Sequence, residues 1–473
     1  MYRIKAVQSP SLQESLFVTV LIICIISLSI IFVEAAPHVP LIISLLVLCV
    51  YGIFKRIPYR LLERGIAEGA KSGMGAVFIF FFIGILIAAW MAGGTIPTMM
   101  YAGFQLVTPN FYFVIVFIVT ALIGLVVGSS LTTIATVGVA FIGISGAVDA
   151  SLAITAGAIV SGAFFGDKMS PLSDTTNMAS STLQVDLFEH IKNMMGTTIP
   201  AFIITLLIFF FISPKLTDAN FDKMAAFQTG LLKTGLIHWE NAVIPLLVLL
   251  IFSIKKVPAI LTLAAGSITA IGIMYLHQSL SIADLFGTLM DGFHSNTGSE
   301  AIDALLTRGG INGMLFTISL VLLALSMGGL LFTLGIIPRL LVSIDHLLNR
   351  VFSVVLASAS TAIGINVLIG EQYLSILLTG ETYQPRYAKV GLENKNLSRV
   401  SEDAGTVINP LVPWSVCGVF ITSVLGVSTL TYLPFAFFCL LSPLLTILYG
   451  FTGWTLTYTK QNESFTNEAI VGE

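Results

Sequence analysis

Charged side chains interrupt one of the most apolar parts of the chain, the stretch Gly162–Ser180. Asp167, Lys168 and Asp174 lie there, in a segment that is otherwise long and apolar enough to cross a lipid bilayer. A charged side chain at membrane depth costs roughly 2.5–3.5 kcal/mol on insertion scales and usually marks an ion pathway, a proton relay or a substrate site. This stretch is therefore the leading candidate for a transport site.

Pro171 predicts that the helix carrying these charges is broken. Proline cannot continue the hydrogen-bond ladder of a helix. The polar run from Ser173 to Asn177 that follows can satisfy the backbone groups that the break leaves free.

The composition requires a polytopic membrane protein, because 56% of the residues are hydrophobic and only 10% are charged. Soluble domains carry about 25% charged residues. Apolar runs of about 20 residues recur along the chain, so we expect an all-α protein that spans the membrane with helices. No basic tract suggests nucleic-acid binding, the four cysteines stand singly, and no protease motif is present. We expect a transporter rather than an enzyme, with no cofactor besides the transported ion.

Ten spans follow from the apolar runs. They are Leu16–Val33, Val39–Phe54, Met74–Gly94, Ser151–Ser180, Thr197–Ile212, Ala242–Ile254, Val257–Tyr275, Ile311–Gly335, Ser398–Leu425 and Tyr432–Tyr449. The spans at 151–180 and 398–425 contain breaks, which we place at the membrane midplane. Two further apolar blocks, 111–146 and 351–380, are polar at their centres, which favours re-entrant hairpins. Whether Thr95–Asn110 also crosses stays open.

The two halves share landmarks at nearly constant spacing. Asp167 and Asp403 begin similar polar runs 236 positions apart, and Gly128 and Gly364 have the same spacing. We interpret residues 1–212 and 242–452 as two repeats joined by a loop at 213–241 and followed by a cytoplasmic tail at 453–473. Five crossings in each repeat would make the second repeat inverted relative to the first.

Basic residues set the expected orientation. They gather between the second and third spans, at Lys255 and Lys256, and in the loops from Arg339 to Arg399 that the same count places on one side. By the positive-inside rule that side is cytoplasmic, with both termini inside the cell.

The repeat should bring the two broken helices and the two hairpin tips together near the midplane. A carboxylate in such a cavity can hold either a proton or a cation, so that binding one expels the other. The candidates for this exchange are Asp174, Asp167, Asp403 and Glu371. Oxygen ligands that suit Na⁺ are offered by Ser129, Ser130, Thr133, Ser170, Ser173, Thr176, Asn177, Asn366, Gln372, Thr406 and Asn409.

Lys168 is the expected countercharge, although Asp167 and Lys168 could instead form a neutralising pair that holds the break. Asp174 has no local cation, and we expect it to carry the exchanged proton. Glu402 and Arg399 are expected nearer the cytoplasmic interface, and His190 in a solvated loop.

Four motifs make the chain resemble the NhaC-type Na⁺/H⁺ antiporters, a family that includes carriers similar to the malate/lactate antiporters. They are FGDKMSPLSDTTNMAS, GSSLTTIAT, EQYLS and SEDAGTVINPLVPW. The resemblance implies paired re-entrant hairpins, a scaffold and a transport domain, an elevator movement and the homodimer that is frequent in the family.

We therefore predict exchange of Na⁺ for H⁺ across the cytoplasmic membrane, with the lipid bilayer as surroundings. The alternative is Na⁺- or H⁺-coupled exchange of small organic anions such as malate or lactate, because the same hydroxyl and amide groups serve both ligands. Stoichiometry and tolerance of Li⁺ or K⁺ are not predictable from the residues.

Overall fold

The computed structural model describes residues 6–33, 35–106, 111–147, 149–214, 218–297, 303, 306–343 and 349–459. Within these ranges the chain is helical and has no β-strand, with two isolated β-bridges, Phe293 with Arg308 and Leu392 with Tyr458. Most of the expected C-terminal tail, from residue 460 onward, lies outside the described residues.

In the first half the elements are α1 (Leu12–Phe32), α2 (His38–Phe54), α3 (Tyr59–Ser72), α4 (Met74–Ala92), α5 (Thr95–Leu106), α6 (Tyr112–Val127), α7 (Ser130–Thr133), the π-helix η1 (Ile134–Gly138), α8 (Val139–Ala147), α9 (Leu152–Met169), α10 (Asp174–Thr182) and α11 (Leu187–Ile212).

In the second half they are α12 (Asp218–Lys233), α13 (Trp239–Ile254), α14 (Ala259–His277), α15 (Ile282–Asp291), α17 (Ile311–Thr333), α18 (Ile336–Ser343), α19 (Val351–Ile369), α20 (Gln372–Lys389), α21 (Asn394–Ser401), the π-helix η3 (Glu402–Thr406), the 3₁₀-helix η4 (Asn409–Leu411), α22 (Val416–Leu425), α23 (Thr429–Tyr432), the 3₁₀-helix η5 (Leu433–Phe435) and α24 (Phe437–Thr452).

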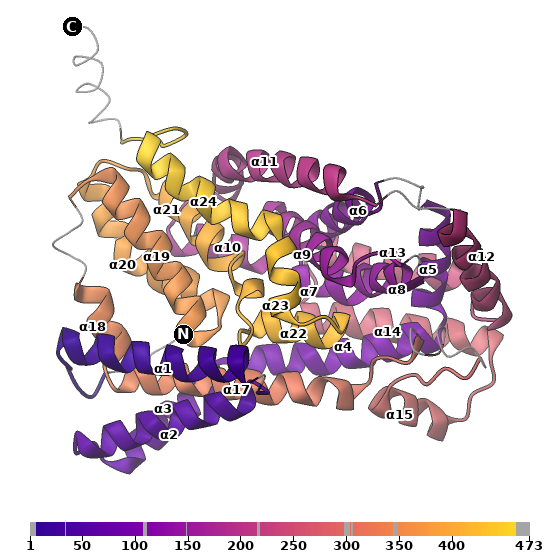
Figure 1. The fold of residues 1–473 in the computed structure, drawn as a ribbon, viewed down its shortest axis with the longest axis horizontal. Coiled ribbons are helices and arrows are strands. Elements are labelled where there is room, and N and C mark those ends of the chain that lie inside the picture. Colours follow the sequence, from indigo (N-terminus) through magenta and orange to yellow (C-terminus); the bar gives the residue numbers. More distant parts are fainter. Residues whose placement is uncertain are drawn as a thin grey trace, which may run out of the picture.

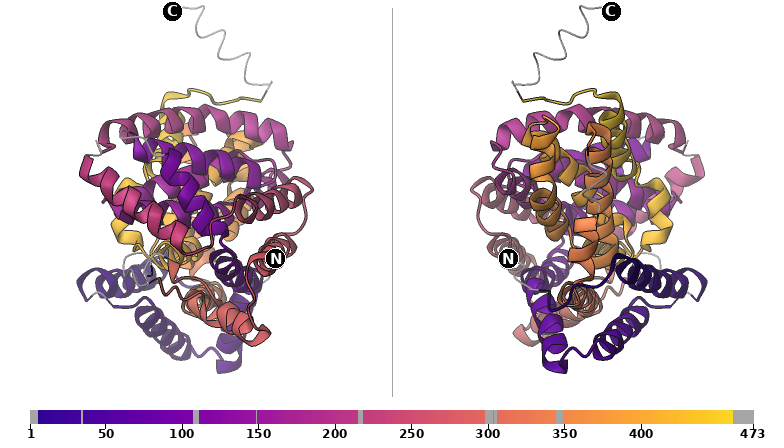
Figure 2. Two further views of the ribbon diagram at one scale, coloured as in Figure 1. Left: turned by 90° about the vertical axis from the view of Figure 1, so that its right-hand side faces the viewer. Right: turned by 90° about the vertical axis from the view of Figure 1, so that its left-hand side faces the viewer.

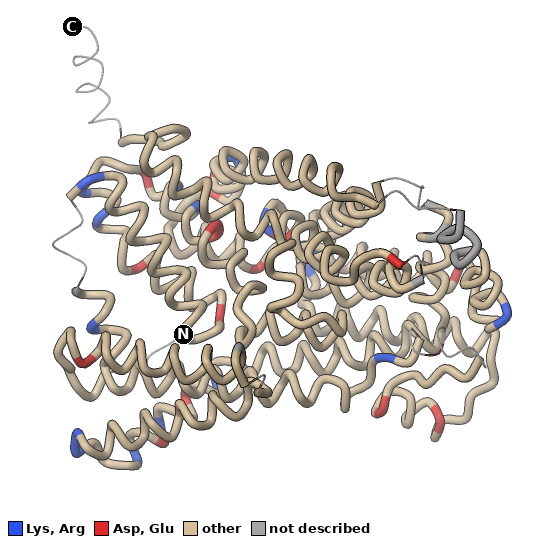
Figure 3. Tube along the Cα trace, viewed as in Figure 1, with Lys and Arg blue, Asp and Glu red and all other residues tan. Residues whose placement is uncertain are grey.

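Seven helices in the described part of the chain are long and apolar enough to cross a membrane, or up to nine if two bent pairs each count as one span. One bent pair, Asn394–Leu411 with Val416–Leu425, turns by 44° and coincides with the break predicted at 398–425. Figure 3 shows charged residues mainly toward the ends of helices, with a few inside. The protein is therefore a multi-pass membrane protein.

The helices form two groups. α1, α2, α3, α4, α14 and α17 lie along one side of the molecule, while α9, α10, α11, α19, α20, α21 and α24 lie on the other (Figure 1). The end-on views in Figure 2 show the same separation. α4 leads into α5, which packs against α8 and α13, and α17 leads into α18, which packs against α1.

The basic segment after α2 is more ordered than the sequence indicates, since it forms the amphipathic helix α3 instead of a loop. Glycines at 65 and 69 let its backbone approach α17 closely. A Cβ atom on Gly69 would lie 2.3 Å from the carbonyl oxygen of Leu325, a distance that no side chain tolerates. The contact joins the α2–α3 segment to α17.

Both predicted hairpin blocks contain a helix, a sharp break and a second helix. α6 ends at Gly128 and α19 ends at Gly370, each in the left-handed conformation, with φ of 68° and 74°. This conformation suits glycine. The second block extends beyond 380, because α20 runs to Lys389. Val351–Ile369 alone is long enough to cross a membrane, so the re-entrant character of this block stays a prediction.

Two features of the helix ends recur at a spacing of 242 positions. Gly128 and Gly370 both adopt the left-handed conformation at the end of a helix, whereas Gly364 lies inside α19. Ser173 and Ser415, which have the same spacing, cap the N-termini of α10 and α22 with their hydroxyls. The division of the chain into two repeats stays a prediction.

Candidate functional site

A cavity of about 320 Å³ brings together the first hairpin tip, the first helix break, the second hairpin tip and the α13–α14 connection. Its polar and charged lining comprises Ser129, Ser130, Thr132, Asp167, Asp174, Thr175, Asn177, Ser253, Lys256, Thr262, Gln372 and Tyr373. Six of the residues predicted from the sequence are among them: Ser129, Ser130, Asp167, Asp174, Asn177 and Gln372.

Asp167 reaches the cavity from the last turn of α9. Its side chain is nearly buried, and its Oδ2 accepts a hydrogen bond of 3.1 Å from the backbone N–H of Ser130. Ser130 is the first residue of α7, whose N-cap is Ser129. The positive end of α7 therefore faces the Asp167 carboxylate and stabilises its charge.

Asp174 lies on the opposite side of the same break, where α10 begins. Ser173 caps α10, and Asp174 follows as its first residue, exposed to the cavity. Neither Asp167 nor Asp174 forms an ion pair within the described residues, although Lys256 also lines the cavity. Two carboxylates on one cavity repel each other unless a cation or a proton lies there.

Lys168 points away from this pair of acids and joins the two halves of the chain. Its Nζ forms an ion pair with Oδ1 of Asp403, and both side chains are fully buried. The interpretation that Lys168 neutralises Asp167 is therefore wrong. Asp403 also accepts hydrogen bonds from three hydroxyls, those of Ser442 (2.7 Å), Thr197 (2.8 Å) and Thr446.

Asp403 is thus fully paired, and it does not line the cavity. The side-chain amides of Asn409 at the second break and of Asn366 on α19 are also hydrogen-bonded and do not line the cavity. Asn409 donates to Oδ1 of Asn366 at 2.7 Å, and Asn366 donates to the carbonyl of Gly405 at 2.6 Å. These contacts tie hairpin α19–α20 to the backbone around η3.

The remaining predicted ligands serve the local backbone. Glu371 caps α20 by accepting from the N–H of Leu374 at 2.7 Å, as Ser129 caps α7. The other contacts are Thr133 with the Ser129 carbonyl, Ser170 with the Leu172 N–H, Ser173 with the Thr176 N–H, and Thr176 with the Lys168 carbonyl. Thr406 is buried, and its hydroxyl has no hydrogen-bond partner among the described residues. The cavity is lined by none of the six predicted residues Thr133, Ser170, Ser173, Thr176, Glu371 and Thr406.

One expectation about the cytoplasmic end is wrong. His190 is buried, not solvated, and its Nδ1 lies 2.8 Å from the hydroxyl of Ser398. Glu402 and Arg399 are also buried, because hairpin α19–α20 and α24 cover the segment that carries them, and their placement near the membrane interface stays a prediction. The first turns of α11 pack against α21, which a hydropathy pattern cannot reveal.

Sequence reasoning missed several polar residues at these centres. The cavity lining includes Ser253 from α13, Thr262 from α14 and Lys256 from the connection between them, which are far from the breaks and hairpins in sequence. The hydroxyl residues Thr197, Ser442 and Thr446 lie in apolar helices, where such residues carry no distinguishing signal in the sequence.

One group in the described part of the chain has spacing suited to a metal ion: His238, Glu240 and His277. The two imidazole rings are stacked in parallel, with centroids 4.0 Å apart. Parallel rings do not direct their nitrogen lone pairs at one point, so this geometry does not form a finished metal site.

Comparison with known proteins identifies the family. The sequence model of the Na⁺/H⁺ antiporter family matches residues 162–454. The Na⁺/H⁺ antiporter NhaC of Alkalihalophilus pseudofirmus is 41% identical over 91% of this chain and 93% of its own length. The protein of the same name in Bacillus subtilis is 39% identical over 93% and 97%.

A third relative is the malate-2H⁺/Na⁺-lactate antiporter of Bacillus subtilis, which is 33% identical over 97% of this chain and 98% of its own length. These relatives are antiporters by name and not enzymes. The matches cover most of the chain and include both helix breaks. The chain belongs to the NhaC-type Na⁺/H⁺ antiporter family.

Proposed function

We propose that this protein exchanges Na⁺ for H⁺ across the cytoplasmic membrane, with the cation held between Asp167 and Asp174. The observation that supports this most is that both carboxylates line one cavity and neither is neutralised by an ion pair among the described residues. Lys168, the nearest basic residue in sequence, is engaged by Asp403. A cation can therefore bind between the two acids without displacing Lys168.

The rest of the lining suits a hard cation. Ser129, Thr132, Thr175, Asn177 and Gln372 supply hydroxyl and amide oxygens, which are the ligands that Na⁺ and similar ions prefer. When the cation leaves, protons can neutralise the two acids. Binding of one ion then opposes binding of the other, which is the basis of exchange.

Exchange of an organic anion is the second candidate, favoured by the size of the cavity. A volume of about 320 Å³ exceeds by roughly tenfold the share of one water molecule, about 30 Å³. The relative named as a malate/lactate carrier shows that the family holds such members. Two features favour the cation. Asp174 already occupies the N-terminus of α10, and no arginine is among the lining residues.

We further propose that the two halves are inverted repeats that alternate access to the site. The features that recur at 242 positions support this, as does a second cavity of about 660 Å³ beside the α1–α2 connection. This second cavity contains Pro37, Pro413 and Thr422 but no carboxylate. Lys256 lines the first cavity, and by the positive-inside rule this supports a state open to the cytoplasm.

In this proposal both termini are cytoplasmic, and the group of helices around α9 and α19 moves relative to the group around α4 and α17. An elevator movement of this kind would carry the cavity toward the other side. The homodimer that the family resemblance implies stays a prediction.

The proposal is tested in inverted membrane vesicles that contain the protein and hold a pH gradient reported by a dye. Adding Na⁺ alone should collapse the gradient, while choline chloride should not. Collapse that requires malate or lactate in addition to Na⁺ would instead establish the organic-anion exchanger.

A further inference from the structure

Glu402 is a buried acid that the proposed exchange at Asp167 and Asp174 does not use. It is the first residue of η3, and its side chain is 0% exposed. Within the described residues, neither oxygen of its carboxyl group has a hydrogen-bond partner. The Thr406 hydroxyl, one turn further along η3, lies near this carboxyl group as the neighbouring donor, and within the described residues it makes no hydrogen bond of regular geometry.

The surroundings of Glu402 connect it to both centres already described. The charged groups whose fields reach its carboxyl are Lys168 and Asp167 on α9 and the adjacent Asp403. The other elements packed against η3 are α10, α19, α20, α21 and α24. α19 and α24 carry no charged residue, and the acid of α10 is Asp174. The charged residues of α20 are Glu381, Arg386 and Lys389, and those of α21 are Lys395 and Arg399.

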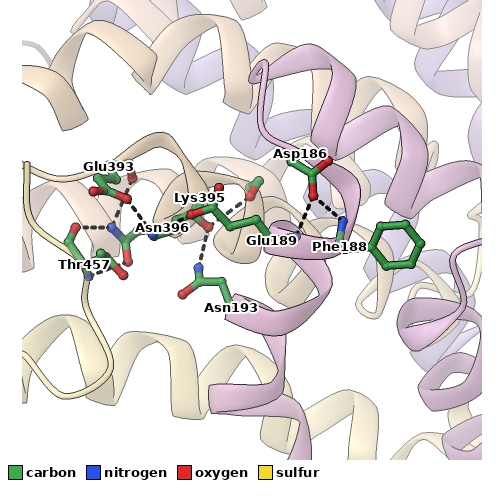
Figure 4. Close-up of polar contacts among 9 residues, drawn as sticks. Asp186, Phe188, Glu189, Asn193, Glu393, Lys395, Asn396 and Thr457 are labelled. Carbon is green, nitrogen blue, oxygen red and sulfur yellow. Dashed lines mark hydrogen bonds and ion pairs between the residues drawn. The ribbon is translucent and has the colours of Figure 1, made fainter.

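The position of Glu402 is fixed from the start of α21. Lys395 forms ion pairs with Glu189 (2.8 Å) and Glu393 (2.6 Å), and its carbonyl accepts from Asn193 at 2.6 Å (Figure 4). Asn396 donates to the carbonyl of Thr457 at 2.7 Å. These contacts hold α21 against α11 and the segment after α24, so Glu402 cannot move to the surface to gain a partner.

A buried carboxylate without a partner is unfavourable, because it loses hydration and gains neither a hydrogen bond nor an opposite charge. A bound proton removes that cost. Lys168, the cation that acts on Glu402, is already paired with Asp403. The local π-helix also departs from regular helical geometry, a distortion that is frequent at functional sites. The geometry therefore describes a proton-binding position distinct from the cavity.

We propose that Glu402 carries a further proton of the exchange cycle, coupled to cation binding at Asp167. This inference rests on the proposed Na⁺/H⁺ exchange. Na⁺ entering beside Asp167 adds positive charge within the field of Glu402 and stabilises its carboxylate. The O–H bond of Glu402 then breaks, the proton leaves to water, and the negative charge that remains is compensated by the Na⁺ that entered.

The test is the pH dependence of Na⁺ affinity, measured by titrating Na⁺ into the purified full-length protein at several pH values. The slope of log Kd against pH counts the protons displaced by each Na⁺. Glu402→Gln, which imitates the protonated side chain, should lower this slope by about one proton while Na⁺ still binds. Glu381→Gln is the matched control, because Glu381 is exposed on the neighbouring α20. It should leave the slope unchanged.

A slope in Glu402→Gln equal to that of the wild type would overturn the inference and leave Na⁺/H⁺ exchange intact. If the wild type itself shows no pH dependence, the proposed function fails instead. Should Glu402→Gln not fold, Glu402→Asp keeps an acid in the same place with a shorter side chain. If the curve of log Kd for Na⁺ against pH is displaced in Glu402→Asp relative to the wild type, the inference is supported. An identical curve overturns it.

Discussion

Replacing Lys168 with methionine should destabilise the fold strongly, because it leaves the Asp403 carboxylate buried without its cation. Asp403 would keep the hydroxyl donors Ser442, Thr197 and Thr446, but these do not neutralise the charge. Breaking a fully buried ion pair by removing one partner costs about 3–5 kcal/mol. Asp403→Asn should cost a similar amount, because it leaves the ammonium of Lys168 with the hydroxyl of Ser442 as its remaining partner.

The double variant Lys168→Met with Asp403→Asn should recover most of this loss. It removes both charges together and leaves an amide that the same hydroxyls can hydrogen-bond. If each single change costs about 3–5 kcal/mol and the pair together costs about 1–3 kcal/mol, the coupling energy is about 3 kcal/mol or more. This value is large because the two side chains are 0% exposed and join α9 to η3.

Equilibrium unfolding of the purified protein in mixed micelles with increasing dodecyl sulfate measures these free energies. The matched control is Lys55→Met, since Lys55 forms a partly exposed ion pair with Glu14 and its loss should cost far less than the loss of the buried pair. The assignment of a buried pair would be refuted if the double variant lost as much free energy of unfolding as the two single variants together. It would also be refuted if each single variant lost no more than the control.

Two further variants test the cavity and the helix packing. Asp174→Asn should abolish Na⁺-driven proton flux in vesicles without lowering the yield of folded protein. The control Asp284→Asn, on the exposed face of α15, should leave the flux unchanged. Normal flux in Asp174→Asn would remove this residue from the mechanism. Gly69→Val should destabilise the protein by about 1–3 kcal/mol or more, since its Cβ would meet the α17 backbone. Gly75→Ala, with nothing within 4 Å, should be tolerated, and equal thermal stability of the two variants would contradict the packing.

The sequence predicts the membrane class and the positions of the two helix breaks, because proline, glycine and polar runs stand out in apolar surroundings. Pro171 and the run after it locate the first break to within a few residues of Ser170–Ser173. The helix α3 was missed, since charged residues in a short segment look the same in a loop and in an amphipathic helix. Its packing depends on Gly65 and Gly69 meeting α17, which only the fold shows.

Pairings between distant residues could not be predicted. The sequence places Lys168 next to Asp167, yet successive residues on a helix point in different directions, and Lys168 reaches Asp403 instead. Glu402 looks interfacial because Arg399 and Lys395 precede it. It is buried because the hairpin α19–α20 packs over η3, and nothing local in the sequence records that contact.

The central claim, that Na⁺ and protons exchange at the cavity of Asp167 and Asp174, is tested most directly by proton release. Na⁺ is added to the purified protein in a weakly buffered solution while a pH dye records the medium. We predict acidification with Na⁺ and none with choline, and a loss of that signal in the variant Asp167→Asn with Asp174→Asn. Na⁺ binding that is detected by its heat but releases no proton from the wild type would contradict the account.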